Sequence, residues 1–262
     1  MDLPLQRLSR DFGIEPGLVI HAGANLCQER FEYDKAGFGP IVWIEALGSI
    51  SNQARVLLKD FRNQFVIQAA LWEKAGVEIP FNISSNNAES SSVFKFKWHE
   101  ALHPHISTQS TVILKSQLLD DVIGVFFEEK IPSVSLLVLD LQGAEYQALL
   151  GAKSLLTITQ AIHVEVSRVE LYKGQKLFYE INEMLNFMDF KLVSHDLTGK
   201  TSSGDALFIR KKLVGEVSCM HLPAKPRFPS ITLKNFIKFF LIRIGVPAKL
   251  IQETMQKLRK YS

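Results

Sequence analysis

A glycine turn set between two apolar segments is the feature that most constrains how this chain folds. Residues 19–25 read Val-Ile-His-Ala-Gly-Ala-Asn, and the apolar run Trp43-Ile44 ends in Glu45. Glu45 lies 20 positions after Asn25, the spacing at which an acid on the second strand of a doubly wound fold reaches a ribose held at the first turn. The pattern predicts a site for a nucleoside-containing cofactor. The alternative is a chance glycine turn with a solvated Glu45.

The composition of the glycine turn narrows the kind of cofactor. A dinucleotide site needs the pattern G-x-G-x-x-G, whose glycines let the backbone approach a pyrophosphate. Residues 23–28 read Gly-Ala-Asn-Leu-Cys-Gln and contain one glycine. The turn is therefore a poor pyrophosphate cradle and favours a smaller nucleoside cofactor without phosphates, such as S-adenosyl-L-methionine.

The rest of the chain alternates apolar strands with helices. We expect strands over residues 18–21, 41–45, 65–69, 77–81, 134–140, 161–166, 190–195 and 205–210. We expect helices over residues 3–12, 26–36, 49–61, 117–129, 145–156 and 175–187. This order, closed by an antiparallel hairpin of the last two strands, predicts an α/β fold with a doubly wound, Rossmann-type, mostly parallel sheet.

Charge divides the chain into two parts. Residues 225–262 carry nine Lys or Arg and a single acid, Glu253, so this segment has a net charge of +8. Because the whole chain is +3, residues 1–224 are −5. Three prolines between residues 223 and 229 separate the parts. We expect a catalytic or binding domain over residues 1–212 and a basic, helical extension over residues 213–262.

The bulk composition predicts a cytoplasmic protein. No run of about 18 apolar residues occurs, and the N-terminus lacks the basic start and apolar run of a secretory signal. The two cysteines, Cys27 and Cys219, suit a reducing compartment. Residues 225–262 mix apolar and basic side chains, which fits either an anionic membrane surface or packing on the body or on a second subunit. The acidic body argues against nucleic acid as a partner.

Three carboxylates follow or end buried strands in the second half of the chain. Asp140 comes at the end of the apolar run 134–139, Glu145 follows across a glycine turn, and Glu165 ends the next apolar run. Ligands bind outside the carboxyl ends of the strands in open α/β sheets, so we expect these three to converge there. The alternative is that Asp140 or Glu145 caps the following helix.

Five short motifs together resemble one known family. They are Gly-Ala-Asn (23–25), Ile-Glu (44–45), Leu-Asp-Leu-Gln-Gly-Ala-Glu (139–145) with Gly-Ala at 151–152, Val-Glu-Val-Ser (164–167) with Leu-Tyr-x-Gly-Gln (171–175), and Asp-Ala-Leu-Phe-Ile-Arg (205–210). In this order they are similar to the FkbM-like family of S-adenosylmethionine-dependent methyltransferases. The resemblance covers residues 17–211 and is most specific over 140–152 and 171–175.

The resemblance implies a class I methyltransferase fold and methylation of hydroxyl oxygens on glycans or secondary metabolites. It implies that the cofactor is lined by residues of the first two strand ends and that Asp140 sits beside the sulfonium and the acceptor. The implied cofactor-binding residues are His21, Gly23, Ala24, Asn25, Glu45 and Asp140.

Three positions depart from the family pattern. His21 stands where the family usually has an Asp that helps to hold the methionine end, Cys27 where it has Gly, and Ala46 where it has Pro. A Cβ at Cys27 makes a positive φ costly. These departures motivate a second hypothesis, in which the chain is a non-catalytic relative that acts as a binding or scaffold module.

Methyl transfer to a hydroxyl needs alignment of donor and acceptor and a base for the proton. The candidate catalytic carboxylates are Asp140, Glu145 and Glu165. Tyr172 and Asp205 are candidate substrate-binding residues, because the strand that Asp205 opens runs antiparallel and starts near the same edge.

The remaining polar clusters predict no metal site. His99, His103 and His105 have metal-like spacing, but Pro104 breaks any helix there and a solvated loop is the expectation. The polar run over residues 82–92, with three serines at 90–92, borders the cofactor or acceptor or forms a plain turn.

Overall fold

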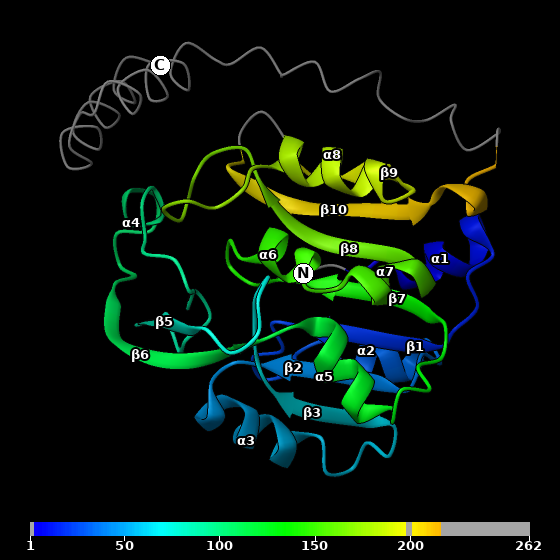
Figure 1. The fold of residues 1–262 in the computed structure, drawn as a ribbon, viewed down its shortest axis with the longest axis horizontal. Coiled ribbons are helices and arrows are strands. Elements are labelled where there is room, and N and C mark those ends of the chain that lie inside the picture. The colour runs from blue at the N-terminus through cyan, green and yellow to red at the C-terminus, as the bar shows by residue number, and fades with distance from the viewer. Residues whose placement is uncertain (1–2, 198–200, 216–262) are drawn as a thin grey trace.

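The computed structural model describes residues 3–197 and 201–215. Its main sheet has seven strands in the order β3-β2-β1-β7-β8-β10-β9, and a three-stranded sheet has the order β4-β6-β5 (Figure 1). The strands are β1 (Leu18–Ala22), β2 (Ile41–Glu45), β3 (Gln64–Gln68), β4 (Ala70–Leu71), β5 (Glu78–Ser84), β6 (Thr108–Gln117), β7 (Val134–Leu139), β8 (Thr159–Ser167), β9 (Phe190–His195) and β10 (Ser203–Arg210). The helices are α1 (Leu5–Phe12), α2 (Arg30–Lys35), α3 (Gly48–Leu57), α4 (His99–Leu102), α5 (Leu119–Phe126), α6 (Glu145–Leu150), α7 (Lys153–Ile158) and α8 (Phe178–Phe187), followed by a 3-10 turn, η1 (Lys211–Leu213).

The predicted α/β architecture is confirmed. Strands β3, β2, β1, β7 and β8 are parallel, whereas β10 pairs antiparallel with both β8 and β9. Every residue of β1 and of β7 is buried, as expected for parallel strands covered on both faces by helices. Two apolar clusters fill the two faces of the sheet, one against α5–α8 and one against α1–α3.

Two predicted helices differ from the structure. The helix expected over residues 26–36 is only the six-residue α2, because Asn25 (φ 42°) and Cys27 (φ 53°) adopt left-handed backbone that a helix cannot contain. The helix expected over 145–156 is split into α6 and α7 at Gly151. A Cβ at Gly151 would lie 2.5 Å from the Trp72 carbonyl oxygen, so this close approach fixes where α6 ends.

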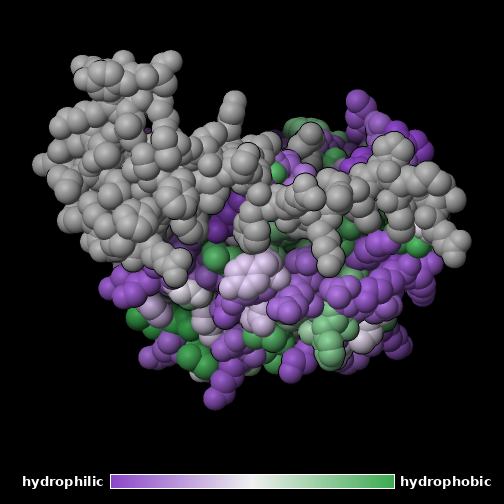
Figure 2. All heavy atoms as spheres, turned by 90° about the horizontal axis from the view of Figure 1, so that it is seen from above, coloured by the Kyte–Doolittle hydropathy of each residue, from purple (hydrophilic) through white to green (hydrophobic). Residues whose placement is uncertain are grey.

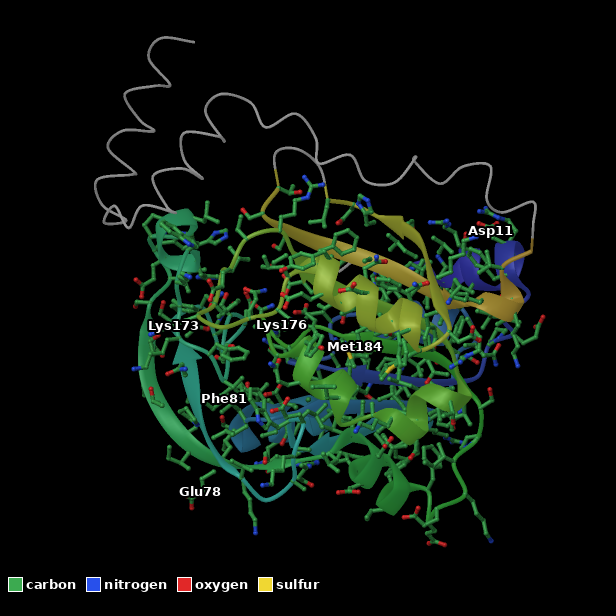
Figure 3. All side chains as sticks on the ribbon, turned by 45° about the horizontal axis from the view of Figure 1, so that its top comes forward. Asp11, Glu78, Phe81, Lys173, Lys176 and Met184 are labelled. Carbon is green, nitrogen blue, oxygen red and sulfur yellow. The ribbon has the colours of Figure 1, made fainter. Side chains whose placement is uncertain are left out.

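Residues 78–117 form a cap over the carboxyl edge of the main sheet. The cap contains β5, the short helix α4 and β6, and β6 pairs antiparallel with β5 along its length. Figure 3 shows Glu78 and Phe81 on β5, at the side of the molecule where the small sheet lies. The cap is tied to the main domain by an isolated bridge between Phe96 and Tyr172.

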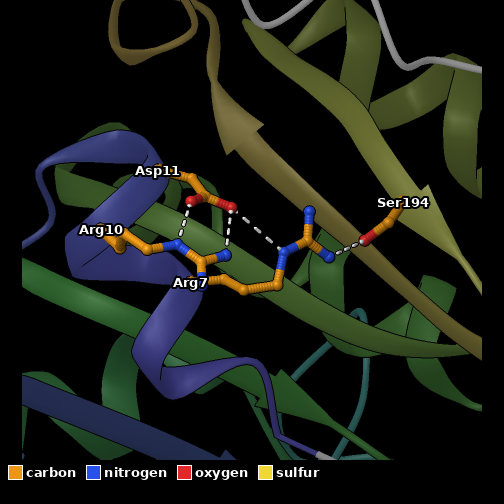
Figure 4. A network of polar contacts seen from close by, with 4 residues as sticks. All are labelled: Arg7, Arg10, Asp11 and Ser194. Atoms are coloured by element: carbon orange, nitrogen blue, oxygen red, sulfur yellow. Dashed lines mark hydrogen bonds and ion pairs between the residues drawn. The ribbon is translucent and has the colours of Figure 1, made fainter.

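Helix α1 packs on one face of the main sheet and is also linked to its edge strand β9. Arg7 lies beside Asp11 (3.3 Å) on its own helix, and Arg10 contacts the same carboxylate at 2.6 Å. Arg7 also donates to the Ser194 hydroxyl on β9 (3.1 Å), so one side chain links the first helix to a late strand (Figure 4).

None of the helices within residues 3–197 and 201–215 reaches the length and hydropathy needed to cross a bilayer. The described surface seen in Figure 2 mixes hydrophilic and hydrophobic side chains. The basic segment 225–262 lies outside the described residues, so its predicted contacts stay predictions.

Candidate active site

The candidate site lies where the carboxyl ends of β1, β2, β7 and β8 meet at one edge of the main sheet. The Gly23 and Ala24 amides, just after β1, both donate to the Ile44 carbonyl oxygen on β2 at 3.0 Å. On the other side, the Asp140 amide donates to the Ala22 carbonyl oxygen at 3.0 Å. The glycine turn is therefore held between the ends of two neighbouring strands.

Gly23 is required at this turn for two reasons. Its φ of +91° is a conformation that side chains rarely tolerate. In addition, a Cβ at this position would lie 1.8 Å from the Asp140 carbonyl oxygen. The bare backbone of the turn thus lets the loop after β1 pack directly on the loop after β7.

Glu45 occupies the position predicted for a ribose-binding acid. Its Oε2 accepts from the Asn25 amide (3.0 Å) and its Oε1 accepts from the Leu47 amide (2.8 Å). Burial raises the pKa of this carboxyl, and the backbone hydrogen bonds oppose that shift. Each carboxylate oxygen retains a second lone pair, so Glu45 is held in place while it can still accept hydrogen bonds from a ligand.

The three predicted carboxylates do converge. One oxygen each of Asp140, Glu145 and Glu165 lies within 4.8 Å of the others. Glu145 Oε1 accepts from the Leu141 amide (2.8 Å) and the Gly143 amide (3.1 Å), so Glu145 shapes the turn after β7. It does not cap α6, because both donors precede the helix and no side chain caps its N-terminus. Burial, with Asp140 nearby, raises the pKa of Glu145 to about 7.

Asp140 and Glu165 are linked by a side chain that the sequence reasoning did not select. Gln142 Nε2 donates to Asp140 Oδ1 at 2.6 Å and lies 3.3 Å from Glu165 Oε2. Burial raises the pKa of Asp140, and the Gln142 hydrogen bond opposes that shift. The pKa of Glu165 lies well above its ordinary value because of burial and of the neighbouring charges of Asp140, Glu145 and Asp205.

Tyr172 lies behind Gln142 rather than at an open surface. Its side chain is 1% exposed, and its hydroxyl donates to Gln142 Oε1 at 2.5 Å. A Cβ at Gly143 would lie 3.2 Å from the Tyr172 ring and from Gln175. The two most specific sequence motifs, 140–145 and 171–175, therefore pack on one another. The glycine at position 143 is the only sequence signal for this close contact, and it does not indicate which residues pack against it.

A small cavity of about 70 Å³ opens at the glycine turn. It is lined by Gly23, Asn25, Glu45, Asp140 and Gln142 among others, and is covered by cap residues between 88 and 93. Phe81 of β5 also lines it (Figure 3). The donors and acceptors fit a nucleoside with an amino-acid arm. Its volume is below the roughly 300–1,000 Å³ that is usual for ligand pockets.

A second, larger cavity of about 1,170 Å³ lies on the α1–α2 face of the sheet. Its described lining includes Arg7, Lys35, His163, Ser194 and Asp205. Asp205 is directly opposite Glu165 in the β10–β8 register, so the two side chains share a face. The larger cavity thus reaches the strand end that carries Glu165, while Asp140 lines the smaller one.

His21 is placed differently from the prediction. Its side chain is 2% exposed, its Nδ1 lies 3.0 Å from the Tyr33 hydroxyl, and its ring stacks on Trp43 at 4.5 Å. His21 is not among the residues that line the small cavity. Burial lowers its pKa to about 3, so it is a neutral core residue. Strand alternation explains this, because His21 points into the α1–α3 face.

Two other positions depart from the family pattern. Cys27 lies on the loop that follows the glycine turn, and Ala46 lies beside the small cavity. Cys27 has the positive φ of 53° that the missing glycine would favour, and burial raises the pKa of its thiol to about 12. Ala46 lines the cavity directly. The loop keeps its shape despite the Cβ at Cys27.

The histidine cluster in the cap is only partly a solvated loop. His103 and His105 are exposed, as expected, but His99 is buried and stacks on Phe96 at 4.4 Å. Within the described ranges, the Asp140–Glu145–Glu165 trio alone brings three potential metal ligands within 4.8 Å. The oxygens of that trio already accept hydrogen bonds. Glu145 accepts from backbone amides, and Asp140 accepts from the side-chain amide of Gln142.

This sheet order, with a glycine turn after β1, Glu45 at the end of β2 and Asp140 after β7 at one edge, is an α/β arrangement suited to a nucleoside-containing cofactor. The sequence comparisons agree. Residues 22–192 match the profile of the family described as Methyltransferase FkbM domain. Since that match covers more than half of the chain, the protein belongs to the FkbM methyltransferase family, whose cofactor is S-adenosyl-L-methionine.

A curated relative with a described activity covers part of the chain. The 2-O-methyltransferase NoeI of Sinorhizobium fredii (strain NBRC 101917 / NGR234) is 32% identical over 124 residues, which are 47% of this chain and 48% of NoeI. The chain thus matches about half the length of that relative.

Solved methyltransferase structures are more distant. Magnesium protoporphyrin IX methyltransferase from Synechocystis PCC 6803, with bound SAM, has 11% identity and a TM-score of 0.45 over 79% of this chain and 76% of that chain. TrmK from M. capricolum, in complex with S-adenosyl-homocysteine, has 10% identity and a TM-score of 0.48 over 100% and 97%.

Proposed function

We propose that this methyltransferase methylates a hydroxyl oxygen on a glycan or a secondary metabolite. The observation that carries the proposal is the half-buried Asp140–Glu165 pair at the strand ends, where Asp140 lines the small cavity and Asp205, opposite Glu165, lines the larger one. A hydroxyl acceptor must lose its proton during methyl transfer, and a carboxylate at that place supplies a base. The name of NoeI, a 2-O-methyltransferase, supports oxygen as the acceptor atom.

We assign the cofactor to the small cavity. Glu45 would accept hydrogen bonds from the ribose hydroxyls, and the backbone of Gly23, Ala24 and Asn25 would lie against the amino-acid arm. When bound, S-adenosyl-L-methionine supplies an electrophilic methyl group on a sulfonium. The acidic residues around this edge favour a ligand that carries positive charge.

We assign the acceptor to the larger cavity, with Asp205 at the end nearest Glu165. Asp140 takes the proton of the acceptor hydroxyl, because Gln142 stabilises its negative charge. Burial and the neighbouring acids raise the pKa of Glu165, which favours its protonated form. Glu145 shapes the turn through two backbone amides instead of touching the acceptor.

The second hypothesis, a non-catalytic binding module, draws on the tight fit of the cap over the small cavity and on Cys27 and Ala46. The two hypotheses differ in what replacing Asp140 does. If the chain is an enzyme, D140A abolishes turnover because no base remains at the reacting hydroxyl.

The experiment measures S-adenosylhomocysteine formation with a panel of glycan and secondary-metabolite acceptors. The D140A variant should lose at least about 100-fold in kcat while its circular dichroism and melting remain cooperative. D205A should mainly raise the acceptor KM. Normal turnover by D140A contradicts the assignment of Asp140 as the base, and absence of turnover by the wild-type chain on every acceptor favours the binding module.

A further inference from the structure

Gln142 is a neutral side chain that donates to two of the three clustered carboxylates, Asp140 and Glu165, which also hydrogen-bond to each other. Its Nε2 lies 2.6 Å from Asp140 Oδ1 and 3.3 Å from Glu165 Oε2. A side-chain amide has a donor end and an acceptor end, and the two can be exchanged by rotation. What Gln142 does to the pair therefore depends on what fixes the direction of its amide.

Tyr172 fixes that direction. Its hydroxyl has one proton and lies 2.5 Å from Gln142 Oε1, against 3.4 Å from the Ser90 carbonyl oxygen. The proton therefore goes to Gln142, whose oxygen must face the tyrosine. In the reversed amide the oxygen would face Asp140 without a proton between them, and the Tyr172 proton would have only the Ser90 carbonyl oxygen, at 3.4 Å, as an acceptor.

The backbone of Gln142 is held as firmly as its side chain. Gln142 has a φ of 53°, and its carbonyl oxygen accepts from the Ser92 hydroxyl of the cap at 2.7 Å. Tyr172 is held in turn by Gln175, whose Oε1 accepts from the Tyr172 amide at 2.9 Å. Contacts from the cap and from the loop after β8 thus hold the side-chain amide of Gln142 in one orientation.

We propose that Gln142, aligned by Tyr172, is a positioning residue that keeps the negative charge of the Asp140–Glu165 pair on Asp140. The inference rests on the proposed function, in which Asp140 is the base. The shorter contact goes to Asp140, and an N–H donor stabilises an ionised acceptor more than a neutral one. The proton of the pair therefore stays on Glu165.

Acidic groups surround the Asp140–Glu165 pair, so a neutral donor such as Gln142 affects which of the two carboxyls holds the proton. Glu145 from α6, Asp205 from β10 and Glu29 from the loop before α2 all face the pair with acidic groups. Burial and these acids raise the pKa of Glu165. Burial also raises the pKa of Asp140, but there the hydrogen bonds from Gln142 and Glu165 oppose the rise. His163, two positions before Glu165 on β8, shares its face. Without Gln142, the two carboxyls would compete for the proton.

Two variants test the proposal. Q142E replaces the donor by a carboxylate of the same shape, and Y172F leaves the glutamine in place but removes the group that aligns it. Carboxyl titrations followed by ¹³C NMR should show the pKa of Asp140 rising by about one pH unit or more in Q142E and by a smaller amount in Y172F. The lower limb of the kcat–pH profile should move upward with it, and kcat at pH 7 should fall about tenfold.

The controls separate positioning from general damage. Q160E makes the same chemical change at an exposed site that contacts Ser133, and Y33F removes a different buried hydroxyl, the one beside His21. Both should leave the Asp140 titration in place. Binding of S-adenosylhomocysteine to Y172F should stay within about twofold of wild type, since Tyr172 does not line the small cavity.

An Asp140 titration unchanged within 0.3 pH units (about 0.4 kcal/mol) in folded Y172F overturns the proposal. If Q142E does not fold, Y172F alone decides. The carboxyl titration needs no acceptor, so it also decides when the proposed function fails. If no acceptor is methylated but Y172F shifts the titration, the positioning role stands and the enzymatic one does not.

Discussion

At the scale of single residues, the buried carboxylates make a stability prediction with a defined sign. The pKa of Glu145 is raised from 4.5 to about 7 by burial, so the folded state binds this proton more tightly than the unfolded one. The resulting stabilisation is complete below about pH 4.5 and is lost as the pH rises to about 7. The E145Q variant cannot ionise, and its amide oxygen can still accept from Leu141 and Gly143.

We therefore expect E145Q to be more stable than wild type at pH 8 by about 2–3 kcal/mol, with little difference at pH 4. Urea unfolding at both pH values measures this, and E78Q, at an exposed position of β5, controls for the amide substitution. An E145Q variant that loses stability equally at both pH values would contradict the raised pKa, because the Glu145 charge, absent at pH 4 and present at pH 8, would then have no effect on stability.

At the scale of elements, the packing of the loop after β1 on the loop after β7 predicts the effect of a single Cβ. Gly23 and Gly13 both have positive φ, but a Cβ at Gly13 meets nothing within 4 Å, whereas one at Gly23 lies 1.8 Å from the Asp140 carbonyl oxygen. G13A should lower the free energy of unfolding by about 1 kcal/mol, because alanine is disfavoured at a positive φ. G23A should lower the free energy of unfolding by at least about 2 kcal/mol more, because its Cβ would push the loop after β1 away from the loop after β7.

Denaturant unfolding of the two variants measures the difference, and equal costs would contradict the close approach of the two loops. G23A should also weaken binding of S-adenosylhomocysteine, since the same loop lines the small cavity. G13A, which lies at the end of α1 and away from that cavity, should bind as wild type does.

How far the sequence predicts the structure also differs between elements. Ile41–Glu45 is found where the apolar run predicted a strand, because buried parallel strands consist of such runs. The helix over 26–36 is wrong, since positive φ at Asn25 and Cys27 leaves no periodic signal. Glu45 and the carboxylate trio followed from strand ends. Tyr172 is among the predicted substrate-binding residues, but its contact with Gln142 was not predicted, because it joins residues 30 positions apart and depends on loop geometry.

At the scale of the whole molecule, the division into residues 1–212 and a basic extension over 213–262 stays a prediction. So does contact of residues 225–262 with an anionic membrane. Co-sedimentation of the full chain with phosphatidylserine vesicles tests it, with phosphatidylcholine vesicles and high salt as controls. Binding that is selective for anionic vesicles and is weakened by salt supports membrane contact, whereas no binding favours packing on the body or on a second subunit.

The most direct test of the central claim is calorimetric titration of the chain with S-adenosyl-L-methionine and S-adenosylhomocysteine. We predict saturable 1:1 binding of both ligands, weakened about tenfold or more in E45A, which loses the acceptor for the ribose hydroxyls. E78A should bind as wild type does. Absence of binding by the folded wild-type chain at millimolar ligand, or equal binding by wild type and E45A, would contradict the cofactor site described above.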